Sequence, residues 1–252
     1  MNYIVGTIDL AQIALYGFWF FFGGLVIYLT REGMREGYPT VSEQDGKPIS
    51  KAFIFPRPSP KTFLRRDGST ITVPEEPDEY ELKAVPTNAF TGSPLTPTGD
   101  PLADGVGPAA WVKRPEWPDK NAEGDVRIRP MRFDNEFEVA SQDADPRGFK
   151  VICCDGESPG TVADIWVDRA EQIIRYFEVE TPKGLKLVPF NLSSVFPSQG
   201  VLQVRSVTKA QFLNAPSIAK GDEITLREED RVMGYFTGGT LYATTARTEP
   251  LI

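Results

Sequence analysis

The chain has 252 residues, a formal net charge of −8 and no histidine. The acidic balance argues against nucleic-acid binding, because a phosphate-binding face needs an excess of basic residues. The lack of histidine excludes Ser-His-Asp catalysis, histidine-assisted cysteine chemistry, histidine metal sites and histidine ligation of haem or chlorophyll-type magnesium within this sequence. The sequence also contains no phosphate-binding glycine loop and no internal repeat.

The first element in chain order is an apolar run from Leu10 to Leu29, in which Gln12 is the only strongly polar residue. A helix of this length extends about 30 Å, the thickness of the hydrocarbon core of a bilayer. A cleaved signal peptide is one alternative, but residues 1–9 contain no Lys or Arg. A buried core helix is the other, but it would need further apolar helices around it. We therefore predict a single transmembrane helix over residues 10–30.

Arg31 and Arg35 follow the apolar run and are the first basic residues of the chain. The positive-inside rule then places residues 1–9 outside and the carboxyl-terminal part of the chain in the cytoplasm. The two arginines are also candidates for contact with anionic lipid headgroups, although juxtamembrane arginines more often only anchor the topology.

Residues 31–145 form a long segment that is dense in proline and glycine. It contains two short strand candidates, Thr62–Leu64 and Thr70–Val73, and little other regular structure. Such a length without helices is poor material for a core of its own. We expect an extended cytoplasmic segment that packs on partner subunits.

Residues 146–252 change to short strands separated by turn signals such as Asp155-Gly156 and Pro182-Lys183-Gly184. This spacing predicts a small, closed antiparallel barrel, so the fold class is one transmembrane helix followed by a mainly β domain. A last strand is expected at Ile224–Leu226, and a short C-terminal helix opens at the acidic residue Glu228 and runs to about Phe236. The expected barrel strands are Phe149–Cys154, Gly160–Val167, Ile173–Glu180, Leu185–Phe190 and Val201–Val207.

Cys153 and Cys154 are adjacent in a strand-like stretch, so their side chains should point to opposite faces. A zinc site or an ordinary disulfide is therefore not expected, and a cytoplasmic location would keep both reduced. We interpret them as two buried small hydrophobic residues.

Six short motifs occur in order along the chain. They are Arg35-Glu36-Gly37-Tyr38-Pro39, Pro60-Lys61-Thr62-Phe63, Pro97-Thr98-Gly99-Asp100-Pro101, Asp104-Gly105-Val106-Gly107-Pro108-Ala109, Asp164-Ile165-Trp166-Val167-Asp168 and Leu226-Arg227-Glu228-Glu229-Asp230. Together they resemble the H subunit of the purple-bacterial photosynthetic reaction centre, over essentially the full length. Six motifs in the same order are far more specific than any one of them alone.

The resemblance implies a periplasmic amino terminus, one transmembrane helix beside the L and M subunits, and a cytoplasmic PRC-type barrel, in the bacterial inner (intracytoplasmic) membrane. In that family the chain is not itself an enzyme. It caps the cytoplasmic side of L and M, shields the quinone sites and helps to deliver protons to the secondary quinone. No cofactor is expected on this chain, whereas bacteriochlorophyll, bacteriopheophytin, quinones and non-haem iron are expected in L and M. Further expected partners are membrane lipids, a light-harvesting ring and a cytochrome subunit.

The proton-transfer candidates implied by the resemblance lie in one predicted hairpin: Asp168, Glu171, Arg175 and Glu178. The residue matching Glu171 lies close to the secondary quinone in similar proteins, with the match of Arg175 as its charge partner, and on a strand these two positions would share one face. Carboxylates suit a relay if burial and like charges raise their pKa toward neutrality. The alternative is a solvated ion pair, worth at most ~1 kcal/mol.

A second group of candidates lies between Asp119 and Pro130. Some family members have two surface histidines here, where protons enter the protein, and the matching positions in this chain are Glu123 and Asp125. A carboxylate with an ordinary pKa near 4 is a less efficient proton donor at neutral pH than an imidazole. We expect either that Glu123 and Asp125 form the proton entry or that the entry has moved to other carboxylates, and Asp119 is a further proton-transfer candidate. The alternative is that the loop is only a solvated acidic surface.

Two hypotheses from different classes follow. The first is a reaction-centre H subunit, structural and proton-conducting. The second is a membrane-tethered PRC-barrel interaction module with no photosynthetic role. The transmembrane span and the long contact segment favour the first.

Overall fold

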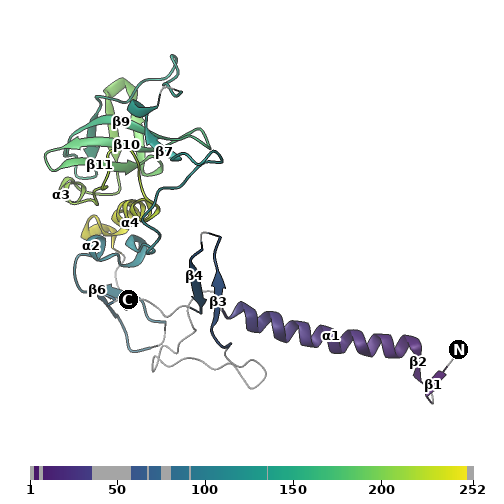
Figure 1. Ribbon diagram of the computed structural model, residues 1–252. Coiled ribbons are helices and arrows are strands. Elements are labelled where there is room, and N and C mark those ends of the chain that lie inside the picture. The colour runs from purple at the N-terminus through teal and green to yellow at the C-terminus, as the bar shows by residue number, and fades with distance from the viewer. Residues whose placement is uncertain are drawn as a thin grey trace. The chain divides into compact units, whose positions relative to one another are not determined.

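The computed structural model describes residues 3–5, 8–35, 58–66, 68–74, 81–90, 92–134 and 136–248. The chain divides into two compact units, residues 1–81 and residues 82–252 (Figure 1). The first unit begins with an antiparallel pair of two very short strands, β1 (Tyr3–Val5) and β2 (Ile8–Asp9).

The apolar run folds as α1 (Leu10–Gly33), a helix of 24 residues of which none is buried. Asp9 begins the helix: its carboxylate accepts a hydrogen bond from Gln12 N–H, and the Gln12 side chain accepts one from Asp9 N–H. The one strongly polar residue of the run therefore caps the helix. By length and composition α1 is able to cross a membrane, as predicted for residues 10–30.

The first unit also contains an antiparallel hairpin of β3 (Lys61–Leu64) and β4 (Thr70–Val73). Thr62 Oγ1 and Thr72 Oγ1 lie 2.8 Å apart across the pair, which joins the two strands by a side-chain hydrogen bond as well as the backbone ladder. Both strands predicted in this part of the chain are confirmed.

A seven-stranded sheet forms the centre of the second unit (Figure 1). Its strands follow the order β11-β10-β9-β8-β13-β12, and β7 pairs with β9 in addition. A separate hairpin joins β5 (Ala84–Pro86) to β6 (Leu95–Pro97). The strands of the sheet are β7 (Ile128–Pro130), β8 (Lys150–Cys153), β9 (Thr161–Asp168), β10 (Ile173–Thr181), β11 (Gly184–Pro189), β12 (Ser193–Phe196) and β13 (Val201–Val204).

The five strands expected between residues 149 and 207 are confirmed, whereas β7 and β12 were not predicted. Two features differ from the closed antiparallel barrel. The β8–β13 pair is parallel, and among the described residues the sheet ends at β11 and β12 without a pairing between them. The 3₁₀ turn η3 (Phe190–Leu192) separates these two strands in sequence.

Helices and short 3₁₀ turns cover the sheet and connect its strands. The longest, α4 (Leu226–Tyr242), packs against η1, α2 and β11. At Gly238 of α4 an added Cβ would lie 2.4 Å from Ala109 Cβ, so glycine allows the close approach of η1. The others are α2 (Pro101–Asp104), η1 (Gly107–Ala109), η2 (Met131–Phe133), η4 (Pro197–Gln199), α3 (Lys209–Leu213) and η5 (Thr245–Arg247).

The predicted strand Ile224–Leu226 is wrong, because Thr225 is the N-cap of α4. Its hydroxyl accepts from Glu228 N–H, and the Glu228 side chain accepts from Thr225 N–H, so the acidic residue forms a capping box and fixes the helix start. The helix also continues past Phe236 to Tyr242, because its second half buries Phe236 in the core and brings Gly238 and Gly239 against other segments.

One core joins the sheet to α4 and includes Trp166, Phe177, Leu202, Phe212 and Phe236, each less than 2% exposed. Burying a large apolar side chain contributes about 1.5–3 kcal/mol to the free energy of unfolding. The pairing of β9 with β10 sets which polar residues of the two strands lie opposite each other.

Cys153 is buried and Cys154 only partly so, and both are free thiols. Burial raises the pKa of the Cys153 thiol to about 12. The interpretation as two buried hydrophobic residues therefore holds for Cys153 but not fully for Cys154, which follows the last residue of β8.

Candidate functional site

The acidic loop before β7 folds back on itself. Lys120 and Val126 form an isolated bridge, and Arg127 N–H donates to Asp119 O at 2.9 Å. Gly124 supports the reversal with a φ of 93°, which glycine adopts without strain. The loop thereby brings the side chain of Arg127 next to Asp119.

The turn between β9 and β10 is built on Asp168, the last residue of β9. Its Oδ1 accepts hydrogen bonds from Ala170 N–H and Glu171 N–H, each at 3.0 Å. Gln172 closes the turn with a φ of 57°. The expectation that Glu171 lies on a strand and shares a face with Arg175 is therefore wrong, because Asp168 organises residues 169–172 as a turn.

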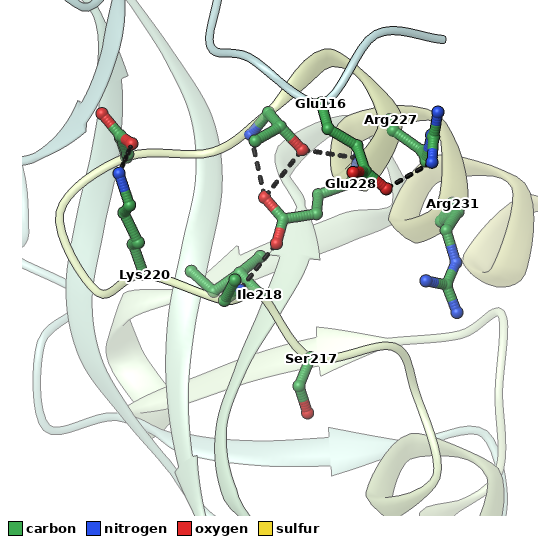
Figure 2. Close-up of a pocket in the computed structure, with 10 residues that line it drawn as sticks. Glu116, Ser217, Ile218, Lys220, Arg227, Glu228 and Arg231 are labelled. Carbon is green, nitrogen blue, oxygen red and sulfur yellow. Dashed lines mark hydrogen bonds and ion pairs between the residues drawn. The ribbon is translucent and has the colours of Figure 1, made fainter. Parts of the chain in front are cut away.

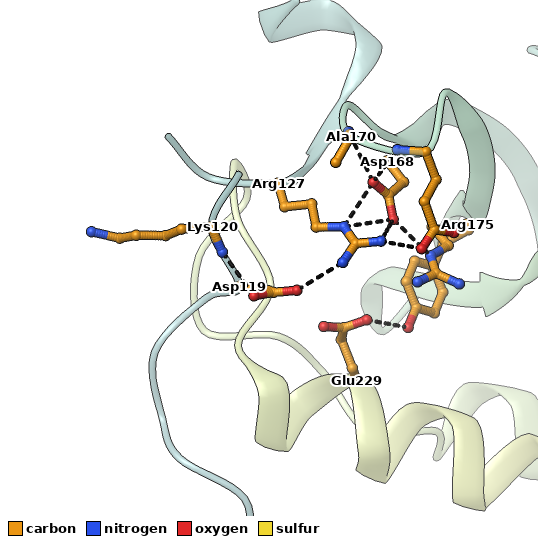
Figure 3. Close-up of polar contacts among 9 residues, drawn as sticks. Asp119, Lys120, Arg127, Asp168, Ala170, Arg175 and Glu229 are labelled. Carbon is orange, nitrogen blue, oxygen red and sulfur yellow. Dashed lines mark hydrogen bonds and ion pairs between the residues drawn. The ribbon is translucent and has the colours of Figure 1, made fainter. Parts of the chain in front are cut away.

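Arg127 joins the loop to this turn (Figure 3). Its Nε lies 2.9 Å from both carboxylate oxygens of Asp168, its Nη1 lies 3.1 Å from Asp119 Oδ2, and its Nη2 donates to Glu171. Arg175 Nε lies 3.2 Å from Asp168 Oδ2. We call these five residues the Arg127 cluster. The ion pair of Glu171 is thus with Arg127, while Arg175, its expected charge partner, lies on Asp168.

The members of the Arg127 cluster differ in their contact with water. Asp168 is fully buried, and burial alone would raise its pKa, but the hydrogen bonds from Arg127 and from Glu171 N–H outweigh this and hold the pKa below its usual value. The hydrogen bond to Asp168 in turn raises the pKa of Arg127. Asp168 and Arg127 are therefore fixed charges at neutral pH. The side chains of Asp119 and Glu171 are 42% and 52% exposed and can exchange protons with solvent.

Glu178 lies in a different cluster, in which both carboxylates are buried. Its two oxygens accept from Arg132 at 2.7 and 3.2 Å, and Trp166 Nε1 donates to Oε2 at 2.8 Å. Asp164, opposite Glu178 in the β9–β10 register, accepts from Arg132 Nη1 at 3.1 Å. We call Arg132, Asp164, Trp166 and Glu178 the Arg132 cluster. Of the four hairpin candidates, the structure therefore brings three together and separates Glu178.

Glu123 and Asp125 are both exposed in the loop before β7. Asp125 Oδ2 lies 3.9 Å from Arg169 Nη1, and Asp125 lines an open cavity of about 670 Å³. The other charged residues of this cavity include Arg129 and Glu223. The loop is thus solvated, and its carboxylates lie on the same reversal that presents Asp119 to Arg127.

Arg31 and Arg35 lie at the end of α1 and just after it. Arg35 is buried: its Nε donates to Glu32 at 2.9 Å and its Nη1 to Ser59 O. Lys61 also donates to Glu32, at 2.8 Å. The guanidinium of Arg35 therefore joins the end of α1 to the start of the β3–β4 hairpin, which leaves Arg31 as the more open candidate for lipid contact.

The sequence did not single out Arg127, Arg132, Tyr176 or Glu229 as site residues. Tyr176 Oη donates to Glu229 Oε2 at 3.3 Å, which connects β10 to the first turns of α4 (Figure 3). The alternation of β10 placed Tyr176 on a defined face, and Glu229 belongs to the Leu226–Asp230 motif. No local signal showed that these segments, more than 50 residues apart, meet.

A further cavity of about 470 Å³ lies at the start of α4 (Figure 2). Most of the charged side chains that line it already interact within the chain: Arg227 pairs with Glu116, Lys220 pairs with Glu223, and Glu228 caps α4. Among the described residues, no group of three or more Cys, Asp or Glu side chains is placed to hold a metal ion.

The fold and the site define a protein with one apolar helix able to span a membrane and a mainly β domain. Residues 138–217 match the PRC-barrel domain, which identifies the sheet from β8 to β13. Residues 2–133 match the photosynthetic reaction centre H-chain N-terminal region. That match covers more than half of the chain, and the chain belongs to the family of photosynthetic reaction centre H chains. It is a subunit of a membrane complex, and the family match decides against the PRC-barrel module without a photosynthetic role.

Proposed function

We propose that this H chain caps the cytoplasmic side of the L and M subunits, shields the quinone sites from water and conducts protons to the secondary quinone. The family match supports an association with the reaction-centre core. Pigments, quinones and non-haem iron then belong to L and M, and the chain itself carries out no catalysis. A light-harvesting ring and a cytochrome subunit are further partners in this proposal.

In this proposal α1 crosses the bacterial inner (intracytoplasmic) membrane once, with residues 1–9 in the periplasm. Arg31 and Arg35 support the orientation, because basic residues next to a span favour the cytoplasmic side. Arg31 contacts anionic lipid headgroups, while Arg35 holds the β3–β4 hairpin to the end of the helix. Residues 31–145 pack on the partner subunits, and residues 146–252 form the barrel domain.

The Arg127 cluster carries the proposal for proton conduction. It places two exposed carboxylates, Asp119 and Glu171, on one guanidinium beside the fully buried Asp168. Reduction of a quinone to a quinol consumes two protons, so a buried quinone needs ionisable groups that connect it to water. Arg127 and Asp168 keep their charges and hold the geometry, and Asp119 and Glu171 pass protons along it.

Glu123 and Asp125 collect protons in this proposal. Both are exposed in the loop that begins at Asp119 and folds back to Arg127, so they belong to the same loop as two members of the Arg127 cluster. Two neighbouring carboxylates attract protons to the surface of the loop.

The test uses assembled reaction centres that carry Asp119→Asn together with Glu171→Gln. We expect slower flash-induced proton uptake and a slower second electron transfer to the secondary quinone, because both exchangeable carboxylates are lost. The matched control is Glu157→Gln, an exposed carboxylate before β9, at the opposite end of the strand from Asp168. Wild-type kinetics in the double variant would show that protons take another route.

The partner proposal is tested by purification through a tag on this chain in mild detergent. Co-purification of L and M with reversible photobleaching in the near infrared is the expected result. A colourless chain from pigmented, photosynthetically grown cells would contradict the proposed association.

A further inference from the structure

A small cavity of about 320 Å³ lies between α4, β10 and η3. Its wall is mixed: Ile173, Phe190 and Met233 are apolar, while Arg175, Tyr176 and Glu229 are polar. A cavity of this size that is partly open to solvent has room for several waters, provided that polar groups can bind them. The cavity is therefore a place where protons can move between side chains and water.

Glu229 is the ionisable carboxyl group on this wall that hydrogen-bonds the interior of the sheet. It lies in the first turns of α4 and is partly buried. Its Oε2 accepts a hydrogen bond at 3.3 Å from Tyr176 Oη, and Tyr176 is 3% exposed. The hydroxyl therefore holds one oxygen of the Glu229 carboxyl against β10, and Glu229 also lines the cavity.

Arg175 connects this cavity to the Arg127 cluster. The residue lines the cavity, and its Nε lies 3.2 Å from Asp168 Oδ2 (Figure 3). Asp119 also acts electrostatically on Glu229. Arg175 thus contacts Asp168 of the Arg127 cluster and also acts electrostatically on Glu229.

Charged residues from β10 and from the segment before β7 act on Glu229, and burial decides the direction of its pKa. Burial raises the pKa of Glu229, and the nearby charge of Asp119 raises it further. The hydrogen bond from Tyr176 and the charges of Arg175 and Arg114 lower it, but the net pKa remains above the ordinary value. Asp230, the next residue on α4, also lines the cavity and accepts from Val112 N–H at 2.7 Å.

We propose that Glu229, positioned by Tyr176, holds a proton that is passed on to the secondary quinone. The proton leaves the Glu229 carboxyl through the cavity beside Arg175. The Glu229 carboxyl gives its proton to water in the cavity and becomes a carboxylate. The reduced secondary quinone of the partner subunits finally accepts that proton, and Asp119 or Glu171 supplies the replacement. This inference rests on the proposed proton-conducting function.

The first test uses assembled reaction centres with Glu229→Gln. The amide keeps the shape of the protonated carboxyl but cannot release a proton, so we expect the second electron transfer to slow by about tenfold or more at neutral pH. The infrared difference spectrum recorded on reduction of the secondary quinone should also lose a carboxylic C=O band. Glu180→Gln, an exposed glutamate at the far end of β10, is the matched control.

The second test is Tyr176→Phe, which keeps the Glu229 carboxyl and removes only the hydroxyl. The lost hydrogen bond stabilised the carboxylate, so the pKa of Glu229 should rise further. We expect the infrared band to remain and the pH profile of proton uptake to shift to higher pH. This variant decides the question if Glu229→Gln does not assemble, because an unshifted profile would overturn the inference.

The outcomes separate this inference from the proposed function. Wild-type kinetics and an unchanged infrared spectrum in Glu229→Gln, together with slow uptake in the Asp119→Asn/Glu171→Gln variant, would refute the role of Glu229 alone. Wild-type kinetics in both sets would refute proton conduction by this chain. A slow second electron transfer with loss of the C=O band in Glu229→Gln supports the inference.

Discussion

The Arg127 and Arg132 clusters use the same pairing chemistry on the same hairpin but differ in their contact with water. At Arg127, the Asp119 and Glu171 side chains are 42% and 52% exposed. At Arg132, the carboxylates Asp164 and Glu178 are only 4% and 3% exposed. The exposure of the carboxylates therefore distinguishes the two clusters. The Arg127 cluster can exchange protons with solvent, whereas the Arg132 cluster stabilises the packing of its segments.

The ion pairs of both arginines also connect the two regions that the family models match. Arg127 and Arg132 lie within residues 2–133, whereas Asp164, Asp168 and Glu178 lie within residues 138–217. β7 pairs with β9 across the same boundary, and residues 82–252 form one compact unit. The end of the H-chain region is therefore part of the structure of the barrel domain, and the arginines hold it there.

The largest expected effect is that of Arg132→Met. The variant leaves Asp164 and Glu178 buried without their cation, which breaks a buried ion pair and costs about 3 kcal/mol. This is the lower end of the usual range, because the Arg132 side chain is 36% exposed and water screens part of the interaction. Urea unfolding of the full chain in detergent, followed by tryptophan fluorescence, measures it.

Arg147→Met is the matched control for that experiment. Arg147 pairs with Asp145 in solvent, with side chains 42% and 40% exposed, so its loss should cost less than about 1 kcal/mol. Equal losses in the two variants would show that burial does not distinguish the Arg132 cluster.

Arg127→Met should come second, at about 2 kcal/mol. Asp168 is fully buried, but it keeps the N–H groups of Ala170 and Glu171 and the charge of Arg175 when Arg127 is removed. The same urea experiment ranks the two arginines. A larger loss in the free energy of unfolding for Arg127→Met than for Arg132→Met would contradict the view that the Arg132 cluster is the main stabilising cluster.

Local sequence signals were sufficient for most of the fold but not for these clusters. Alternation and turn residues gave β9 and β10, and the length of the apolar run gave α1. Arg127 meets Asp168 only because residues 128–130 pair with β9, about 40 residues further along the chain. A three-residue strand next to a 3₁₀ turn has too little periodicity to be predicted.

The candidate residues were found by resemblance, and their partners were not. Asp168, Glu171 and Arg175 meet in the structure, but the resemblance gave no sign that Arg127 would bind Asp168 and Glu171. The predicted strands left residues 168–172 as the connection of the hairpin, but the left-handed φ of Gln172 was not predicted. Glu178 was grouped with the others by sequence position, whereas the cross-strand register places it opposite Asp164.

The pH at which acid unfolding begins provides a third test of the difference between the two clusters. The pKa of Asp168 lies below its ordinary value of 3.8, so its contribution to stability is present above that pH and is lost as the pH falls through the folded value. In Arg127→Met the pKa of Asp168 rises, because burial remains and the main hydrogen-bonding cation is gone. Acid unfolding, followed by near-ultraviolet circular dichroism, should then begin at a higher pH. Asp168→Asn, which has no carboxyl to titrate, should remove this part of the acid transition.

The smallest effect on stability is expected for Glu171→Gln, and this makes it the sharpest test of function. Glu171 is 52% exposed, so its ion pair with Arg127 contributes less than about 1 kcal/mol, and urea unfolding should barely change. Proton uptake in assembled reaction centres should nevertheless slow, because the amide cannot carry a proton. Glu178→Gln should show the reverse, since its carboxylate is buried on Arg132 and Trp166: a loss of stability with wild-type proton uptake. Slow proton uptake in Glu178→Gln at unchanged stability would mean that the Arg132 cluster, and not the Arg127 cluster, carries protons.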